Sequence, residues 1–372
     1  MQCDYFDSAR CRSCTLMGVP YDEQLRRKDD AVRRALADVA DHDAWSPPFA
    51  SREAGFRNKA KLAVGGTISQ PTLGIMDRQG TGIDLRGCGL YEAGLGAVLP
   101  RLGEFVTQAA IAPYHLGTRR GELKNLLVTH SPDGELMVRF VLRSQEAVSR
   151  IRKHLPDLRR GLPQLRVASA NILPEHKAVL EGDLEIPLTD DESLPMRLDE
   201  VTLHLRPQSF FQTNTAVAEG LYAQAQQWCA EVDGTYIWDL YCGVGGFGLH
   251  LAATDRRVTG IETSPEAVAS ARLSAVDRPG RLEFFAQDAV AFARARKAPD
   301  LVVVNPPRRG IGDLTGWIEA SSVATVLYSS CNAQSLAVDL SRMPSMRVTR
   351  ARMFDMFPQT NHHEVLVLLQ RR

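Results

Sequence analysis

Hydrophobic and polar residues alternate in two different ways along the chain. From residue 49 to about residue 200, short apolar runs such as 126–128 and 136–142 are separated by Gly, Pro and Asp. Between these two runs, Ser131-Pro132-Asp133-Gly134 is typical of a hairpin turn. Beyond residue 200, apolar runs alternate with helical patterns. The chain therefore predicts a β-rich region followed by an α/β region.

The α/β region contains repeated strand–helix units. Apolar, β-branched runs occur at 236–241, 257–262, 282–285, 300–304 and 323–328, and the chain ends with a predicted strand pair at 346–354 and 364–369. Repeated units of this kind predict a parallel sheet whose loops gather at the carboxyl ends of the strands. We therefore expect candidate chemistry at that edge of the sheet.

The start of the chain combines cysteines with one amphipathic helix. The helix is predicted over Tyr21–Ala40, with an apolar stripe that includes Val32 and Leu36. Before it stand Cys3, Cys11 and Cys14, and a fourth cysteine, Cys88, lies in Leu85-Arg86-Gly87-Cys88-Gly89. Four thiolates suit either zinc or an iron–sulfur cluster, and their spacing does not separate the two.

The length of 372 residues exceeds one ordinary domain. We predict three regions: 1–90 with the cysteine cluster, 91–200 as a β-rich domain, and 201–372 as an α/β domain. No apolar run approaches the roughly 18 residues of a membrane span, and the N-terminus lacks the features of a signal peptide. A cytoplasmic location is expected, and in that reducing compartment the cysteines should not form disulfides.

Charge is balanced overall but segregated along the chain. Lys and Arg outnumber Asp and Glu two to one over 119–160, whereas 181–200 is strongly acidic. The segment 146–161 is predicted to be a basic helix, and alternation would place Arg57, Lys59 and Lys61 on one face of a strand. These features suit contact with RNA phosphates, and they equally suit ordinary solvated faces.

A glycine-rich turn follows the first strand of the α/β region. Asp239 precedes it, its glycines include Gly243 and Gly245, and the acidic residue Glu262 ends the next strand. This arrangement is shared by dinucleotide-binding folds and S-adenosylmethionine (SAM) methyltransferases. The sequence Asn305-Pro306-Pro307 favours a methyltransferase. Amino-methyltransferases with a similar motif carry an aromatic residue after the prolines, where this chain has Arg308.

A cysteine occupies the end of the last predicted parallel strand. Cys331 follows the run 323–328 and opens a helical pattern, so the helix N-terminus should favour its thiolate. Taken alone, a cysteine there is more often a packing residue. Methylation of a pyrimidine at C5, however, requires a thiolate to add at C6, because only then does C5 become nucleophilic.

Together these residues resemble the RNA uracil-C5 methyltransferase family. The motifs that carry the resemblance are 208–214 (QSFFQTN), 239–247 (DLYCGVGGF), 305–310 (NPPRRG), 329–332 (SSCN) and 354–364 (FDMFPQTNHHE). The N-terminal cysteines resemble those of the family's iron–sulfur branch, and within that branch the resemblance implies methylation of 23S rRNA at uracil 747. The resemblance implies a Rossmann-like, seven-stranded sheet with its last strand antiparallel, a central β-rich RNA-binding domain and an N-terminal iron–sulfur loop. A small β-barrel (TRAM) domain is not expected.

The resemblance also implies a role for particular residues. Cys331 would be the nucleophile and Glu364 the general base. The implied SAM contacts are Gln212, Tyr241, Glu262, Asn305 and Asp288, and the implied [4Fe-4S] ligands are Cys3, Cys11, Cys14 and Cys88. The expected partner is 23S rRNA, for a monomer without a membrane or an obligate protein partner.

Other functions remain open at this point. A tRNA uracil-C5 methyltransferase shares the chemistry, although the tRNA enzymes that this family brings to mind lack the cysteine cluster. A non-catalytic iron–sulfur protein that binds RNA is disfavoured by the presence of both Cys331 and Glu364. Without the resemblance, Glu364 would be read as a charged residue near the start of a strand.

Overall fold

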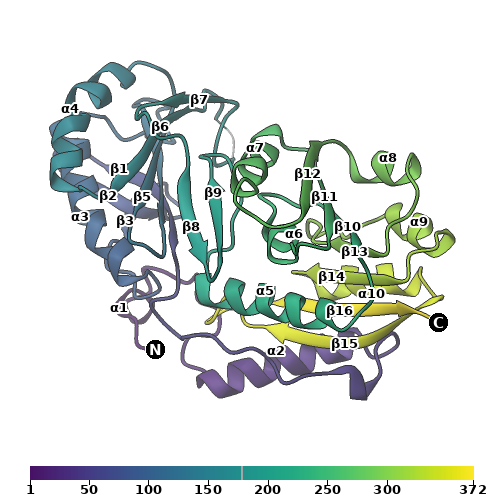
Figure 1. Ribbon diagram of the computed structural model, residues 1–372. Helices are drawn as coiled ribbons and strands as arrows, with labels where there is room; N and C mark the ends of the chain where they lie inside the picture. The colour runs from purple at the N-terminus through teal and green to yellow at the C-terminus, as the bar shows by residue number, and fades with distance from the viewer. Residues whose placement is uncertain (177–178) are drawn as a thin grey trace. The chain divides into compact units, whose positions relative to one another are not determined.

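The computed structural model describes residues 1–176 and 179–372, and it divides into two compact units (Figure 1). The N-terminal unit comprises Met1–Ser13 and Ala54–Met196. The C-terminal unit comprises Cys14–Glu53 and Arg197–Arg372. Within the described ranges, no helix is long and apolar enough to cross a membrane.

The C-terminal unit is built on a seven-stranded sheet with the order β12-β11-β10-β13-β14-β16-β15. The strands are β10 (Tyr236–Leu240), β11 (Arg257–Glu262), β12 (Arg281–Ala286), β13 (Leu301–Val304), β14 (Thr325–Ser330), β15 (Met346–Phe354) and β16 (Glu364–Arg371). The strands from β10 to β14 pair in parallel, whereas β16 runs antiparallel to both β14 and β15. The Rossmann-like sheet with an antiparallel last strand is thus confirmed.

Helices cover both faces of this sheet. On one face, α2 (Tyr21–Ala35), α8 (Ala289–Arg294), α9 (Leu314–Ala320) and α10 (Ala333–Ser341) share an apolar core with Trp238 and the other side chains that point to that face. Residues from β10, β13, β14 and β16 alternate into this core, as their near-complete burial requires. On the other face lie α5 (Thr215–Ala230), α6 (Gly246–His250) and α7 (Pro265–Ser274), which contact the sheet at β16, β10 and β12 respectively.

The N-terminal unit contains a second seven-stranded sheet, with the order β3-β2-β1-β4-β5-β6-β7. Its strands are β1 (Lys59–Gly66), β2 (Pro71–Met76), β3 (Gly82–Asp84), β4 (Leu123–His130), β5 (Leu136–Leu142), β6 (Leu165–Ile172) and β7 (Leu184–Pro187). All neighbours pair antiparallel except β5 and β6. The hairpin turn predicted at 131–134 is present between β4 and β5, which confirms it.

Two helices cover one face of the N-terminal sheet. Helices α3 (Ala93–Gln108) and α4 (Val148–Gly161) bury their apolar sides in one core with alternate residues of β1, β4, β5 and β6. The basic helix predicted at 146–161 corresponds to α4. A short helix, α1 (Asp4–Asp7), stands near the start of the chain, and a two-stranded sheet of β8 (Leu194–Leu198) and β9 (Val201–Leu205) lies where the chain leaves this unit.

The compact units do not coincide with the three regions expected at 1–90, 91–200 and 201–372. The segment Cys14–Glu53 packs with the C-terminal sheet, because Val32 and Leu36 of its helical segment are buried in that sheet's core. The helix predicted at 21–40 ends at Ala35, and the short 3-10 helix η1 (His42–Ala44) follows it and contacts β15. The amphipathic stripe predicted a buried face, but a stripe alone does not say which sheet covers it.

Candidate functional site

Cys331 stands at the carboxyl edge of the C-terminal sheet. Strand β14 ends at Ser330, and α10 begins at Ala333, so Cys331 lies in the short connection between them. The side chain of Asn332 closes this connection, because its Oδ1 accepts a hydrogen bond from the backbone N–H of Gln334 at 3.1 Å. The thiol is therefore held at the position predicted from the sequence, on a rigid strand end.

Glu364 faces the same place from the neighbouring strand. In the antiparallel pairing of β14 with β16, Ser330 lies opposite Val365. The next step of the same register brings Cys331 level with Glu364, the first residue of β16. The two residues are distant in the chain, yet the charge of Glu364 acts on the thiol of Cys331. The structure thus brings together the two predicted catalytic residues.

The environment of Glu364 favours a carboxyl group that titrates near neutrality. Burial raises its pKa to about 7, since its side chain is 3% exposed. The hydroxyl of Ser329 donates a hydrogen bond to Oε1 at 2.6 Å and acts in the opposite direction, lowering the pKa. A carboxylate with a pKa near neutrality is suited to take up a proton and to release it again.

The thiol of Cys331 does not have the lowered pKa that its place before a helix predicted. Burial raises the pKa, and the negative charge of Glu364 raises it further, while the nearby Arg308 lowers it. The expected stabilisation of the thiolate by the helix N-terminus is therefore outweighed. The backbone of Arg308 is tied to the same connection as the thiol, since Asn332 Nδ2 donates to its carbonyl oxygen at 3.2 Å.

The glycine-rich turn after β10 has a backbone that requires its glycines. Gly245 has φ +85°, and a Cβ there would lie 3.0 Å from Leu249 Cδ1, so both its conformation and its surroundings favour glycine. Gly243 has φ +53°, and a Cβ there would meet no atom within 4 Å, so the turn is open on that side. Tyr241 also has a positive φ of 63°, which is strained for a residue with a side chain.

Two carboxylates line this turn. Glu262, at the end of β11, accepts from Gly243 N at 3.2 Å and from the backbone N–H groups of Thr263 and Ser264. Asp239 is fully buried, and burial raises its pKa to about 7. One of its oxygens accepts from Gly248 N at 2.8 Å, and the other, Oδ1, has no partner in the described part of the chain. Asp239 belongs to the quoted motif, but sequence reasoning gave its carboxyl group no role.

Asp288 stands beside the turn, at the start of α8. Its Oδ1 caps that helix by accepting a hydrogen bond from Ala291 N at 2.8 Å. Its charge also contributes to the raised pKa of Tyr241, which burial chiefly causes. Tyr241, Glu262 and Asp288, three of the predicted SAM contacts, are thus grouped around the turn.

The two remaining predicted SAM contacts approach from other elements of the same unit. Asn305 follows β13, and its backbone N–H donates to Leu240 O at 3.4 Å, so it stands level with the end of β10. Gln212 is buried ahead of α5, two residues before the helix cap Asn214. The structure therefore places Asn305 next to the strand that leads into the turn, whereas Gln212 comes from the segment before α5.

The four predicted cysteine ligands divide between the two units. Cys3, Cys11 and Cys88 belong to the N-terminal unit, where Cys3 and Cys11 add to the raised pKa of the Cys88 thiol, which burial chiefly causes. Tyr5 Oη accepts a hydrogen bond from Gly87 N at 3.1 Å, so the chain start lies against the segment that carries Cys88. Cys14 is assigned to the C-terminal unit. Over residues 1–176 and 179–372, no group of three or more His, Cys, Asp or Glu side chains forms a metal site.

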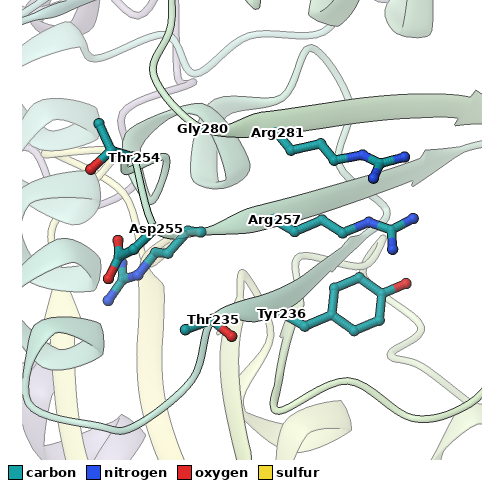
Figure 2. Close-up of a pocket in the computed structure, with 8 residues that line it drawn as sticks. Thr235, Tyr236, Thr254, Asp255, Arg257, Gly280 and Arg281 are labelled. Carbon is teal, nitrogen blue, oxygen red and sulfur yellow. The ribbon is translucent and has the colours of Figure 1, made fainter.

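A cavity of about 650 Å³ opens at the opposite edge of the C-terminal sheet (Figure 2). Its lining includes Tyr236, Arg257 and Arg281, which begin β10, β11 and β12, so it lies at the amino ends of the strands. Arg257 stacks over the ring of Tyr236, and both Arg257 and Arg281 pair with Glu283. These two cations are therefore already paired, and none of the predicted site residues lines the cavity.

Sequence reasoning missed the differing environments of three residues within the motifs it quoted. Ser329 was treated as part of a pattern, although its hydroxyl contacts the carboxylate of Glu364. Phe210 and Phe211 were not distinguished, although Phe210 is 71% exposed and Phe211 is buried. A strand pattern predicts which positions alternate, but the partner of Ser329 depends on the neighbour across the sheet, which no local pattern shows.

Comparison with known proteins gives matches over nearly the whole chain. Residues 183–372 match the family model for tRNA (Uracil-5-)-methyltransferase. The 23S rRNA (uracil(747)-C(5))-methyltransferase RlmC of Shigella boydii is 47% identical over 376 residues, which cover 100% of each chain. The protein of the same name from Salmonella enteritidis is 48% identical, again over 100% of each chain.

A solved structure also matches at this length. It is the tRNA (uracil-54, C5)-methyltransferase of Pyrococcus abyssi in complex with S-adenosyl-L-homocysteine. The match has a TM-score of 0.78 and 27% sequence identity, and it covers 96% of this chain and 85% of that chain. Sequence and structure thus point to the same group of proteins.

Removal of the Ser329 hydroxyl tests the electrostatics of Glu364. In Ser329→Ala the carboxylate loses a hydrogen bond that lowers its pKa, so the pKa should rise. A hydrogen bond to a charged group contributes on the order of 1.5 kcal/mol, which corresponds to a rise of about one pH unit. The measurement is an NMR titration of carbon-13 in the Glu carboxyl groups, with Glu364→Gln identifying the signal. Ser341→Ala, at the exposed end of α10, is the control, and an unchanged Glu364 pKa in Ser329→Ala would contradict the assignment.

Proposed function

The chain belongs to the family of RNA uracil-C5 methyltransferases, and we propose that it transfers a methyl group from SAM to C5 of uracil 747 in 23S rRNA. The observation that carries the reaction is the pairing of Cys331 with Glu364 at the adjoining ends of β14 and β16. The choice of rRNA rests on the relatives named for that substrate, which match the full chain at 47% and 48% identity.

The two paired side chains supply the covalent steps. The thiol proton of Cys331 passes to bulk water, and the thiolate adds through sulfur to uracil C6. The electrons of the C5–C6 double bond move into an enolate whose nucleophilic carbon is C5. That carbon takes the methyl group of the sulfonium, which leaves S-adenosylhomocysteine. Glu364 then removes the proton from C5, and the electron pair of that C–H bond re-forms the C5–C6 double bond and expels the thiolate. A carboxyl group with a pKa of about 7 is suited to this final proton transfer.

The glycine-rich turn and its neighbours are proposed to hold SAM. Gly243 leaves open space, and the buried Asp239 Oδ1 is without a partner in the described part of the chain, so the turn fits a polar ligand. Glu262 is placed to accept hydrogen bonds from ribose hydroxyls, and Tyr241 and Asp288 stand beside it at the turn. The proposed set is completed after β13 and before α5 by Asn305 and Gln212.

The N-terminal unit is proposed to contact the RNA. Its helix α4 exposes a row of cations, namely Arg152, Lys153, Arg159 and Arg160. Lys61 is exposed on β1, where Lys59 stands on the same strand face. Such cations suit the phosphate contacts that position an RNA, whereas the reacting uracil must leave its stack to reach Cys331.

We also propose that Cys3, Cys11, Cys14 and Cys88 bind a [4Fe-4S] cluster. Three of these thiols are neighbours in one unit, and Cys14 follows Cys11 by three positions in the chain. Thiolates are the ordinary ligands of such a cluster, and zinc accepts the same set. When bound, the cluster would tie the start of the chain to the segment around Cys88.

A labelling experiment tests the proposed substrate. Purified protein is incubated with SAM labelled in the methyl group and with either 23S rRNA or tRNA, and the modified base is mapped. We expect label on C5 of uracil 747 in 23S rRNA and none in tRNA. Label only in tRNA, or on an exocyclic nitrogen, would overturn the proposal. The tRNA enzyme of P. abyssi, which has a similar structure, makes tRNA the informative comparison.

Substitution of the proposed base should trap an RNA adduct. In Glu364→Gln the proton stays on C5, so β-elimination from Cys331 fails and the RNA remains covalently bound after methyl transfer. We expect an adduct that resists denaturant and product release slowed by about 100-fold or more. The double variant Glu364→Gln with Cys331→Ala should form none. Glu231→Gln, which alters an exposed ion pair with Arg350, is the matched control and should release its product normally. Free turnover by Glu364→Gln would count against the base role.

The metal content tests the cluster separately. Protein purified without oxygen should be brown and should contain iron and sulfide in equal amounts. Cys88→Ser should lose both, whereas Cys229→Ala should keep them, because Cys229 is a buried cysteine of the C-terminal unit. A colourless protein with one bound zinc would show that the thiols serve a different metal.

A further inference from the structure

The segment Asp355–His363 connects β15 to β16 and leads directly into Glu364. At its base, Phe354 of β15 pairs with Glu364 of β16, so any shift of this loop is passed to the start of β16. Helix α2 belongs to the same unit and lies along this strand pair (Figure 1). Its side chains and the residues just before it make an unusual set of polar contacts with the loop.

The first of these contacts is a buried ion pair. Lys28 Nζ lies 2.6 Å from Asp355 Oδ1, and the two side chains are 2% and 0% exposed. Lys28 also donates to Phe357 O at 3.0 Å, and Tyr21 Oη donates to Asp355 Oδ2 at 2.9 Å. Burial lowers the pKa of Lys28, although Asp355 opposes that effect. Because desolvation offsets most of the attraction in such a pair, its main effect is to specify one geometry.

The second contact is a reciprocal pair of hydrogen bonds between two glutamines. Gln359 N donates to Gln24 Oε1 at 3.0 Å, and Gln24 Nε2 donates to Gln359 Oε1 at 2.9 Å. Leu16 N donates to Gln359 O at 3.0 Å, so the backbone of Gln359 is held on both sides. Every one of these partners comes from the segment that starts at Cys14.

Gln359 is also strained. Its φ is +67°, and it is 1% exposed. A non-glycine residue in this region is destabilising and persists only where its surroundings hold it. The packing of α2 against the sheet does not require these polar contacts with the loop. Val32 of α2 and Leu36, which follows the helix, already provide that packing. The strain and the buried charge are concentrated on the one loop that delivers Glu364.

We propose that Gln24 and Lys28 are positioning residues for the proton-transfer step, because they fix the loop 355–363 and so hold Glu364 level with Cys331. This inference rests on the proposed function. Catalytic groups need to be held within about 0.5 Å of the productive geometry by residues that do not themselves react. Loosening the loop moves the carboxylate and leaves Cys331, which β14 and α10 position, in place. The consequence is a covalent RNA intermediate that forms normally and breaks down slowly.

The test uses two variants that affect the loop in different ways. Gln24→Leu removes both hydrogen bonds between the Gln24 side chain and Gln359 and keeps the volume. It also removes the bonds from Gln24 Nε2 to Leu16 O and Val19 O. Gln359→Gly removes the two side-chain bonds of Gln359, which join Oε1 to Gln24 and Nε2 to Glu53, and it accommodates the positive φ without strain. Gln226→Leu is the matched control, because it removes a glutamine bond to a backbone oxygen, His250 O, elsewhere in the same unit. Measured quantities are the rate of methyl transfer in a single turnover, the rate of RNA release, the affinity for SAM and the melting temperature.

We expect both loop variants to slow RNA release by about 10- to 100-fold, as a displacement of about 1 Å predicts. Methyl transfer and SAM affinity should stay within about twofold of wild type, so that the denaturant-resistant adduct accumulates. Gln359→Gly should do this at a temperature where it is fully folded, and a selective loss of RNA release is something that a purely structural role does not predict. Gln226→Leu should behave like wild type.

Two outcomes would overturn the inference. One is normal RNA release in Gln359→Gly, which folds without strain at that residue. The other is an equal loss of methyl transfer and release together with a lower melting temperature in both loop variants. The proposed function fails differently, because then wild type would not methylate uracil and Glu364→Gln would trap no RNA. A trapped adduct in Glu364→Gln with normal release in Gln359→Gly rejects the positioning role alone.

Discussion

The antiparallel insertion of β16 between β14 and β15 is the constraint on which the site depends. In a sheet of parallel strands only, the carboxyl ends of the strands gather at one edge and the amino ends at the other. Because β16 runs the other way, its first residue, Glu364, comes to the same edge as the end of β14. The thiol of Cys331 and the carboxylate of Glu364 can therefore meet although one follows its strand and the other begins its strand. The hydrogen bonds of the sheet fix the separation of the two groups.

Burial at this edge raises the pKa of both groups, with opposite consequences for their reactivity. It raises the pKa of Glu364 to about 7, which suits a base that must accept a proton and return it. It also raises the pKa of Cys331, which disfavours the reactive thiolate, and the charge of Glu364 adds to that effect. Arg308 acts against both effects on the thiol and stands where amino-methyltransferases have an aromatic residue. An arginine at this position therefore lowers the pKa of the Cys331 thiol, which an aromatic residue would not do.

Much of this arrangement could be predicted from the sequence, and the failures share one cause. The strand–helix alternation predicted the parallel sheet, and the glycine-rich turn and Cys331 were placed correctly at its edge. Glu364 was identified by resemblance, since a charged residue at a strand start has no distinctive pattern. The contact of Ser329 with Glu364 and the packing of α2 were missed, because both depend on partners that are distant in the chain. The pKa of Cys331 was misjudged because the helix was visible in the sequence and the burial was not.

Two buried carboxyl groups of the C-terminal unit, Asp355 and Glu364, have different kinds of partner. Asp355 is paired with the ammonium of Lys28, whereas the hydrogen bond to Glu364 comes from the neutral hydroxyl of Ser329. A cation placed directly on Glu364 would lower its pKa and weaken it as a base. A cation placed at Asp355, where the loop leaves β15, orders the loop without that effect, because the pKa of Glu364 is set by its burial and by the hydrogen bond from Ser329. The position of the ion pair in the loop is therefore compatible with both a fixed carboxylate and a pKa near neutrality.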